Sequence, residues 1–433
     1  MSVENNKPDD YTVLPDFLVE LLENVAKTEG FENFTYAISA GSNHGDGFLA
    51  AMKRITVTGK RNGRDEELSL IFKLMPASAA RREQFNSTKV FRREVVMYNT
   101  VLKKMNDFQI EKGLTAEDGF FEYPKCYGVV EDEANDRFAL VMEDLKKSKY
   151  EMFDKLKPSD YNHVKLFMEA LGKYHGVSFA LKDQRPGVFE EFKDLEDIFG
   201  DQVKNSPEMM QAMFRFAYDR AMVAFDDDIA KENAVLTLRK SKENYLNELI
   251  NLPQGRKSEP FSVVNHGDCW NNNLMFKYDE ETNVPQKICL LDWQLGRYSS
   301  PVLDISYFMF SSTDRKLREQ HFDKLIKIYH SSLSNTIRKL GSDPDKLFSF
   351  SDLQGELKRY GRFGLILAPI LLQIITSNPG DIPDMDEFAE DMANKTKTMD
   401  ESMATFASIS SLEVYNQRVR DVVKDGMLLG YYE

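Results

Sequence analysis

Two polar segments in the second half of the chain contain the residue types that a metal-assisted reaction would need. Residues 265–274 read Asn-His-Gly-Asp-Cys-Trp-Asn-Asn-Asn-Leu, and residues 291–294 read Leu-Asp-Trp-Gln. Each segment follows an apolar run typical of a short strand, so Asp268 and Asp292 should lie at strand ends. Two carboxylates and an amide that converge there could bind a hard divalent cation, because such cations prefer oxygen ligands.

The spacing within the first segment suits a catalytic loop. Asp268 and Asn273 are five residues apart, so one loop can supply both a base and a nearby oxygen ligand. Asp292 would complete the magnesium coordination from the facing strand. The alternative is a solvated turn, in which Asp and Asn side chains accept hydrogen bonds from neighbouring backbone groups. That alternative suits any single residue, but the complete arrangement favours a site.

The loop pattern is also similar to that of a known group of enzymes. His-Gly-Asp-x-x-x-x-Asn followed by Asp-x-Gln resembles the phosphotransferase loop of the aminoglycoside and choline kinase superfamily. The fuller strings His-Gly-Asp-Cys-Trp-Asn-Asn-Asn-Leu-Met-Phe-Lys-Tyr-Asp and Leu-Leu-Asp-Trp-Gln-Leu-Gly-Arg-Tyr-Ser-Ser-Pro-Val-Leu-Asp resemble the ecdysteroid kinase-like family of arthropods. The resemblance implies a protein-kinase-like fold with ATP and Mg²⁺ as cofactors.

The resemblance also implies roles for individual residues of the loop. Asp268 would be the base that orients the substrate hydroxyl, and Asn273 and Asp292 would bind Mg²⁺. His266 would be a scaffold residue, interpreted as a buried histidine rather than a proton shuttle. Asp304 would hold the loop from the start of a helix, and an ordinary first-turn Asp would act by the same physics.

A lysine in the first half of the chain is a candidate phosphate ligand. In the predicted strand 68–75, alternation places Lys73 opposite the apolar residues at even positions, and a lysine in an apolar strand is costly unless its ammonium finds an anion. The helix that follows has apolar residues at helical spacing, with Glu94 on or beside that stripe. We expect Lys73 and Glu94 to pair, which is how kinases hold a lysine on nucleotide phosphates. A solvent-reaching Lys and a rim Glu are the alternative.

Two further segments could contact a nucleotide. The glycine-rich segment 41–47 has the spacing Gly-x-x-x-Gly-x-Gly, and the backbone amides of Ser42 and Asn43 could cradle phosphate. An ordinary hairpin turn explains the same glycines.

The second of these segments is an apolar strand, 138–142, that runs into a polar break. By the family resemblance this break is the hinge, where Met142, the carbonyl of Glu143 and the amide of Leu145 would contact adenine.

The spacing after the second acid favours a small acceptor molecule. Only 11 residues separate Asp292 from Asp304, without an Asp-Phe-Gly or Ala-Pro-Glu sequence. Protein kinases have a long activation segment there, which docks a polypeptide. The Met- and aromatic-rich segment 208–225 is a candidate region for an apolar acceptor pocket, although such a stripe at helical spacing is usually core. Choline and aminoglycosides would favour an acidic pocket, and a polyhydroxylated steroid an apolar one.

The predicted elements divide the chain into a β-rich part and a helical part. Strands are expected over 48–58, 68–75 and 137–142, with a helix over 85–104. Helices are then expected over 161–181, 207–250, 322–340 and 353–375, and short strands over 261–265, 274–278 and 288–291. This order predicts an α+β, bilobal fold, with a small nucleotide-binding lobe (1–144) and a large helical lobe (145–433) that holds an embedded β-hairpin.

Composition narrows the possible partners and the compartment. The net charge of −14 over 433 residues argues against nucleic acid as a main binding partner.

The N-terminus lacks the features of a signal peptide. The apolar run 363–376 is too short to span a bilayer and has Pro369 in its middle, which predicts a buried helix in two pieces. The three cysteines are scattered and odd in number, so we expect reduced thiols in the cytoplasm. The sequence implies no protein partner.

The leading hypothesis is therefore an ATP- and Mg²⁺-dependent phosphotransferase acting on a hydroxyl group of a small lipophilic molecule. Resemblance suggests an ecdysteroid or a related steroid or xenobiotic alcohol, with a choline- or aminoglycoside-type kinase as an alternative. A catalytically silent ligand-binding protein on a kinase fold is a further alternative, although silent relatives should have lost at least one of Lys73, Asp268, Asn273 and Asp292. A metal-hydrolase site is disfavoured because the six histidines form no spaced cluster.

Overall fold

The chain folds into two compact units of different composition. A computed structural model describes residues 13–41, 51–154, 156–229, 231–381, 383–406 and 412–432. The first unit, here called the sheet unit, comprises the described residues up to Val95 together with Pro124–Lys149 and Asp384–Thr396. The second, here called the helical unit, comprises Val96–Tyr123, Tyr150–Pro383 and the described residues from Lys397 onward. The predicted α+β class, with an N-terminal β-sheet and a larger helical region, is confirmed.

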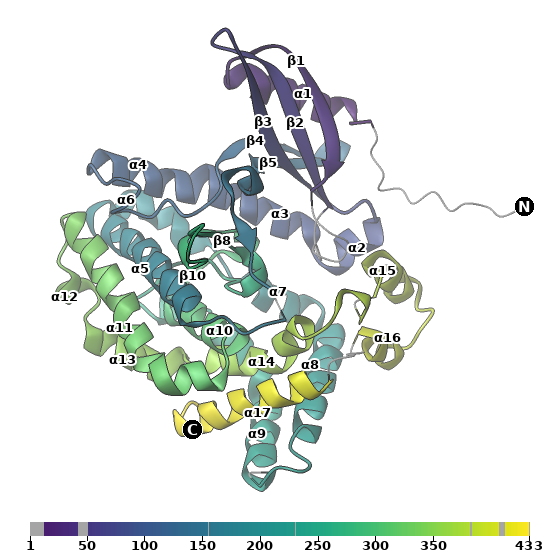
Figure 1. Cartoon of the computed structure of the whole chain (residues 1–433). Coiled ribbons are helices and arrows are strands. Elements are labelled where there is room, and N and C mark those ends of the chain that lie inside the picture. The colour runs from purple at the N-terminus through teal and green to yellow at the C-terminus, as the bar shows by residue number, and fades with distance from the viewer. Residues whose placement is uncertain are drawn as a thin grey trace, which may run out of the picture. The chain divides into compact units, whose positions relative to one another are not determined.

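The sheet unit is built on one five-stranded antiparallel sheet, with strand order β1-β2-β3-β5-β4 (Figure 1). The strands are β1 (Phe31–Ala40), β2 (Ala51–Arg61), β3 (Arg64–Leu74), β4 (Cys126–Asp132) and β5 (Arg137–Glu143). Helix α1 (Asp16–Thr28) packs against the sheet, because Leu18 and Leu22 share a core with Leu70 and Phe72 of β3. The even positions of β3 therefore form the core face, as the alternation predicts, and Lys73 lies on the other face.

The hairpin between β2 and β3 is longer than the sequence pattern indicates. The predicted strands end at residue 58 and begin again at residue 68, but the strands of the structure continue to Arg61 and resume at Arg64. Asn62 and Gly63 alone form the turn, with φ angles of 51° and 76°. Two consecutive left-handed residues of the type Asn-Gly give the tight turn that matches strand twist. The polar residues on both sides of the turn can therefore keep the backbone hydrogen bonds between β2 and β3.

Helices complete the sheet unit. They are α2 (Ala79–Gln84), α3 (Ser87–Val96) and, from much later in the chain, α15 (Met385–Asn394). Helix α15 packs on α2, with the rings of Phe85 and Phe388 stacked at 6.4 Å and an ion pair of 3.3 Å between Arg81 and Asp386. The helix predicted over 85–104 continues beyond its expected end, because α3 is followed by a π-helical segment over Met97–Leu102 and then by α4 (Lys103–Glu111).

Helices of four to 25 residues make up most of the helical unit. They are α4 (Lys103–Glu111), α5 (Tyr161–Gln184), α6 (Pro186–Phe189), α7 (Ile198–Asn205), α8 (Pro207–Val223), α9 (Lys231–Asn251), α10 (Val302–Ser312), α11 (Arg315–Lys339), α12 (Pro344–Leu347), α13 (Phe350–Tyr360), α14 (Arg362–Ile375), α16 (Met399–Phe406) and α17 (Leu412–Leu428). The helix predicted over 207–250 is divided into α8 and α9. The one predicted over 353–375 is divided at Gly361 into α13 and α14.

Pro369 does not divide its helix, contrary to the sequence prediction. Helix α14 runs without a break through Pro369, although proline removes one backbone hydrogen bond from a helix interior. Most of its side chains are buried, and it packs against α10 and α17. The hydroxyl of Tyr415 on α17 donates to the carbonyl of Pro369 at 3.2 Å. Tertiary packing therefore stabilises a helix that the local sequence weakens.

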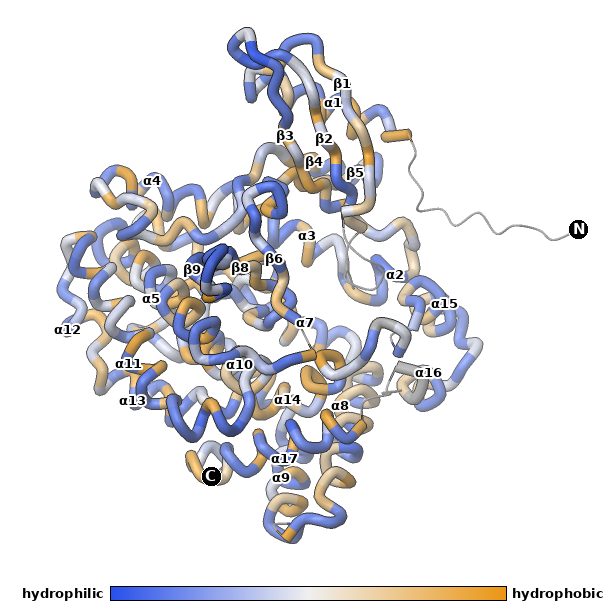
Figure 2. The backbone as a smooth tube through the Cα atoms, in the orientation of Figure 1, coloured by the Kyte–Doolittle hydropathy of each residue, from blue (hydrophilic) through white to orange (hydrophobic). Residues whose placement is uncertain are grey.

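Short strands lie among these helices. β8 (Leu274–Tyr278) and β9 (Pro285–Leu290) form the predicted hairpin, and β6 (Glu151–Met152) extends it to three strands. β7 (Val263–Asn265) pairs instead with β10 (Arg297–Ser299), a strand that the sequence analysis missed. Within the described part of the chain, no helix is long and apolar enough to cross a membrane. Figure 2 shows hydrophilic residues interspersed with hydrophobic ones along α11 and α17.

Candidate active site

The loop between β7 and β8 carries the predicted catalytic residues of the helical unit. Its last residue, Asn273, accepts a backbone hydrogen bond of 2.8 Å from Leu291, which lies just after β9. This bond continues the β8–β9 ladder and places Asp292 beside the loop. Asp268, Asn273 and Asp292 therefore come together where two strands end, as the sequence pattern predicts.

Two hydrogen bonds orient the Asp268 carboxylate. Its Oδ2 accepts from the Asn273 amide at 2.9 Å, and its Oδ1 accepts from the Tyr307 hydroxyl at 2.7 Å. Removal from water and the nearby Asp292 charge raise the pKa of Asp268 to about 6. Burial disfavours the charged form, and so does a like charge. A carboxylate in this state can accept a proton near neutral pH.

Asn273 and Asp292 are suited to a hard divalent cation. Asn273 uses its amide nitrogen to donate to the side chain and the backbone carbonyl of Asp268, so its Oδ1 oxygen, which accepts no hydrogen bond from the described residues, can face a cation. Among those residues no group of three or more His, Cys, Asp or Glu could enclose a metal. In proteins Mg²⁺ usually binds through one or two carboxylates and takes its other ligands from water and phosphate.

Asp292 has an unusual backbone conformation. Its φ and ψ are 62° and 66°, in the left-handed region, which few non-glycine residues adopt and which costs energy. The amide of Gln294 donates to the Asp292 carboxylate at 3.2 Å. This hydrogen bond restrains one of the two oxygens of the carboxylate.

The backbone of the β7–β8 loop is held by Asp304, in the first turn of α10. The Asp304 carboxylate accepts the backbone N–H groups of His266 at 2.7 Å and Gly267 at 3.0 Å. It also contacts Nε2 of His175 on α5 at 3.3 Å. Burial alone would raise the pKa of Asp304, but the hydrogen bond and charge of His175 hold it below its ordinary value. Asp304 therefore remains an acceptor for the loop.

His266 acts as part of the scaffold. It is fully buried, its Nε2 lies 2.9 Å from the carbonyl of Leu291, and its Nδ1 lies 3.3 Å from the backbone N–H of Asp268. These partners assign the proton to Nε2 and leave Nδ1 as an acceptor. Burial lowers the pKa of His266. A neutral, doubly hydrogen-bonded imidazole agrees with the interpretation of His266 as a structural residue.

Gly267 is required by the shape of the loop. Its φ is +90°, and a Cβ atom there would lie 2.0 Å from the carbonyl oxygen of Leu295. Any other residue would meet both unfavourable backbone geometry and a clash with backbone atoms. The turn that places Asp268 therefore depends on glycine at this position.

In the sheet unit, Lys73 of β3 and Glu94 of α3 form the ion pair that the sequence predicts. The Lys73 ammonium lies 2.6 Å from the Glu94 carboxylate, and both side chains are buried. A buried pair of this kind fixes a lysine in one conformation. Its role on nucleotide phosphates stays a prediction.

The predicted adenine-contacting residues lie at the end of the sheet. Met142 and Glu143 end β5, and Leu145 begins a short 3₁₀ turn. Between them Asp144, which the sequence analysis did not single out, accepts hydrogen bonds of 2.7 Å from both Arg54 and Ser69. The segment that follows β5 is thus tied to β2 and β3. Ser42 and Asn43 lie outside the described residues.

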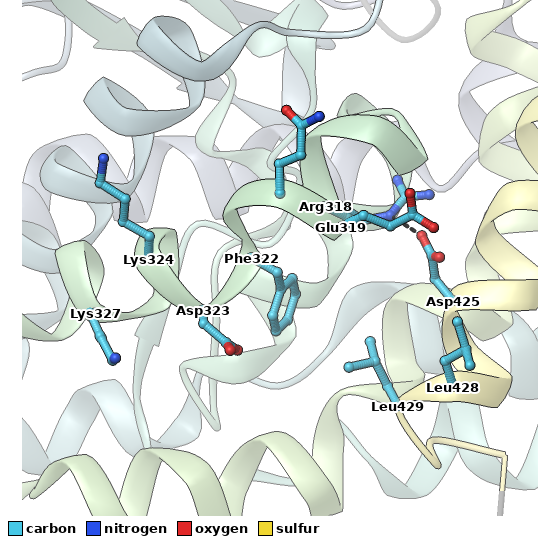
Figure 3. Close-up of a pocket in the computed structure, with 10 residues that line it drawn as sticks. Arg318, Glu319, Phe322, Asp323, Lys324, Lys327, Asp425, Leu428 and Leu429 are labelled. Atoms are coloured by element: carbon cyan, nitrogen blue, oxygen red, sulfur yellow. Dashed lines mark hydrogen bonds and ion pairs between the residues drawn. The ribbon is translucent and has the colours of Figure 1, made fainter.

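The candidate acceptor region and the described pocket are separate features. Segment 208–225 forms most of α8, where several of its large side chains are core residues; the ring of Phe214, for example, stacks on that of Tyr245 at 4.5 Å. A pocket of about 500 Å³ lies instead between α11 and α17 (Figure 3). It is lined by Arg318, Phe322, Lys324, Lys327, Asp425 and Leu428, among others. None of the predicted site residues lines it.

Tyr307 and His175 are the main site residues that sequence reasoning missed. Tyr307 follows Asp304 by three residues, so the two share one face of α10. That spacing could have identified Tyr307, because a helix face that contacts the backbone of the loop can also contact the side chains of the loop. His175 lies on a helix far away in sequence, and nothing local marks it as a partner of Asp304.

Comparisons with known proteins identify the family of the chain. Residues 44–342 match the ecdysteroid kinase-like family, so the chain belongs to that family. A 42-residue segment is 38% identical to 4-hydroxytryptamine kinase from Psilocybe cyanescens, covering 10% of this chain and 12% of that protein.

Two solved structures were also found by structural comparison. Both are GDP complexes of aminoglycoside 2′-phosphotransferase-IIIa. A mutant form gives a TM-score of 0.39 at 10% identity, covering 94% of this chain and 97% of that one. The wild-type form gives 0.37 at 9% identity, covering 94% and 99%.

Proposed function

We propose that this member of the ecdysteroid kinase-like family is an ATP- and Mg²⁺-dependent phosphotransferase. Its acceptor would be a hydroxyl group of a small lipophilic molecule, such as an ecdysteroid or a related steroid or xenobiotic alcohol. The observation that carries the proposal is the setting of Asp268. Its carboxylate is held by Asn273 and Tyr307 in a loop that Asp304 anchors.

Asp268 would accept the proton of the acceptor hydroxyl. The hydroxyl oxygen would then bond to the γ-phosphorus of ATP, the bond from that phosphorus to the bridging oxygen would break, and ADP would leave. The pKa of about 6 supports this role, because the carboxylate is ionised at neutral pH and still basic enough to take a proton.

Asn273 and Asp292 would hold Mg²⁺ through their oxygen atoms. When bound, the ion supplies positive charge that neutralises the phosphates and the charge that develops in the transition state. The hydrogen bond from Gln294 to Oδ2 of Asp292 supports this assignment, since it restrains the carboxylate.

The sheet unit would supply the nucleotide contacts. We assign Lys73, fixed by Glu94, to the phosphates of ATP. We also assign the backbone amides of Ser42 and Asn43 to phosphate, and Met142, Glu143 and Leu145 to adenine, following the family pattern.

A small acceptor is supported by the segment after Asp292. Its 11 residues form a 3₁₀ turn, strand β10 and the start of α10, which leaves no long activation segment to dock a polypeptide. The match to 4-hydroxytryptamine kinase adds a second candidate acceptor, a hydroxyl group on an aromatic ring. Three free cysteines support the cytoplasm as the compartment.

An ATP-consumption screen would test the function. The purified protein, with Mg²⁺ and ATP, would be mixed with ecdysteroids, other sterols, hydroxyindoles, phenolic glycosides and choline-like amines, and phosphorylated products identified by mass spectrometry. We expect a phosphate ester of a lipophilic alcohol. Phosphorylation of the choline-like amines alone would exclude the proposed substrate class. ATP binding without transfer to any acceptor would favour a silent ligand-binding protein.

A further inference from the structure

Tyr307 contacts the side chain that the proposed mechanism uses as a base. Its hydroxyl donates to Oδ1 of Asp268 at 2.7 Å, and the residue is 7% exposed. The other oxygen, Oδ2, accepts from Asn273. The carboxylate is thus held between two donors that come from different elements, the loop itself and α10.

Two donors restrain a carboxylate more than one does. With Asn273 alone, Asp268 could rotate about a single hydrogen bond and keep that bond. The second bond at Oδ1 removes this freedom. Each carboxylate oxygen keeps a further lone pair, so neither bond prevents the acceptor hydroxyl from approaching.

Contacts with other helices hold α10 in place, so the position of Tyr307 is well defined. Gly364 of α14 lies against the middle of α10. A Cβ atom on Gly364 would lie 2.2 Å from the carbonyl oxygen of Ser306. At the C-terminal end of α10, Arg318 donates to the carbonyl of Thr313 at 2.7 Å, and Arg418 donates to that of Ser311 at 2.6 Å. The Tyr307 hydroxyl is therefore placed by the packing of three helices.

The direction of the hydrogen bond is also defined. Burial and the charge of Asp268 raise the pKa of Tyr307 above its ordinary value, so the phenol keeps its proton and donates it. Phenylalanine would fill the same volume without this donor.

We propose that Tyr307 is a positioning residue that holds Asp268 in the orientation needed to accept the proton of the substrate hydroxyl. The proposal rests on the proposed phosphotransfer function. A misplacement of a reacting group by about 1 Å can cost on the order of 10²-fold in rate. Partial loss of orientation in Tyr307→Phe should therefore lower kcat by about tenfold. KM for ATP should change by less than about twofold, because Tyr307 contacts the base and not the proposed metal ligands.

Tyr174→Phe is the matched control. Tyr174 is a fully buried tyrosine of the same unit, and its hydroxyl has no hydrogen-bond partner among the described residues. Loss of this hydroxyl should leave kcat, KM and the orientation of Asp268 unchanged. Thermal unfolding of both variants would verify that each is folded at the assay temperature.

Crystal structures of the wild type and Tyr307→Phe provide a readout that does not depend on turnover. We expect one orientation of the Asp268 carboxylate in the wild type, and a rotated or divided orientation in the variant. One unchanged orientation in the variant overturns the proposal, as does an unchanged kcat. If the wild type phosphorylates no acceptor, the proposed function fails, and the crystal structures still decide whether Tyr307 positions Asp268.

Discussion

The Asp304 carboxylate accepts the backbone N–H of Gly267 at 3.0 Å, although the two residues are 37 positions apart in sequence. The same carboxylate accepts the N–H of His266. Two consecutive donors of the catalytic loop thus share one fully buried acceptor. The position of the loop is consequently set by helix α10 and not by the loop sequence alone.

Asp304→Asn should destabilise the fold. Asparagine has one acceptor oxygen in place of two, so one buried N–H group of the loop would lose its partner, at a cost of about 1–3 kcal/mol. Urea denaturation would measure this as a lower midpoint. Asp345→Asn, a change on the exposed surface, should stay within about 0.5 kcal/mol. Equal stability of Asp304→Asn and the wild type would contradict the role of Asp304.

Asp268→Asn should lower kcat by roughly 10²-fold or more, because a general base contributes at least that factor. ATP affinity should stay near the wild-type value, since Asp268 is assigned to the acceptor hydroxyl. Steady-state kinetics and calorimetry would separate these two quantities. Normal turnover in this variant would refute the assignment of Asp268 as the base.

Asp292→Ala should remove the part of ATP affinity that depends on Mg²⁺. We expect a loss of more than about tenfold, or ~1.4 kcal/mol, in calorimetry with Mg²⁺, and little change when the metal is chelated. Glu281→Ala, in the exposed turn between β8 and β9, is the control. Undiminished Mg·ATP binding by Asp292→Ala would count against Asp292 as a metal ligand.

Gly267→Ala should disrupt the loop, because the new Cβ atom would lie 2.0 Å from the Leu295 carbonyl oxygen at a φ of +90°. We expect a loss of stability of at least about 2 kcal/mol. Gly355→Ala makes the same change in the interior of α13, where the added methyl group has nothing within 4 Å. That variant should be more stable by about 0.5–1 kcal/mol. Thermal unfolding of both would compare them directly.

His266 should make stability depend on pH. Burial lowers its pKa in the folded protein, so below the ordinary value of about 6.5 the unfolded chain binds the proton first. The stability that neutral His266 contributes is present above that pH and is lost as the pH falls toward the folded pKa. Between pH 7.5 and 5.5 the wild type should lose more stability than His266→Gln. Parallel curves for the two proteins would exclude this effect.

Local patterns predicted much of the fold and of the candidate site. Alternation in β3 was sufficient to place Lys73 opposite the core face. Helical spacing was sufficient to place Glu94 near Lys73. The spacing of the loop predicted that Asp268 and Asn273 would meet. These features depend on residues close in sequence, where strand and helix geometry determine direction.

Long-range contacts were not predictable in the same way. β10 has only three residues, Arg297–Ser299, and it exists because β7 pairs with it. The continuity of α14 through Pro369 depends on packing against other helices. The hydrogen bond from Tyr307 to Asp268 could be predicted only if the position of α10 relative to the loop were known. No single segment of the sequence determines that position.

Helix α15 has a consequence for the order in which the protein can be completed during synthesis. It packs on α2 of the sheet unit, with Phe388 against Phe85, yet it is translated about 300 residues after that helix. The N-terminal part of the chain leaves the ribosome first, so this part of the surface of the sheet unit stays uncovered until about 300 further residues have been made. Early termination before residue 385 would leave Phe85 without that partner.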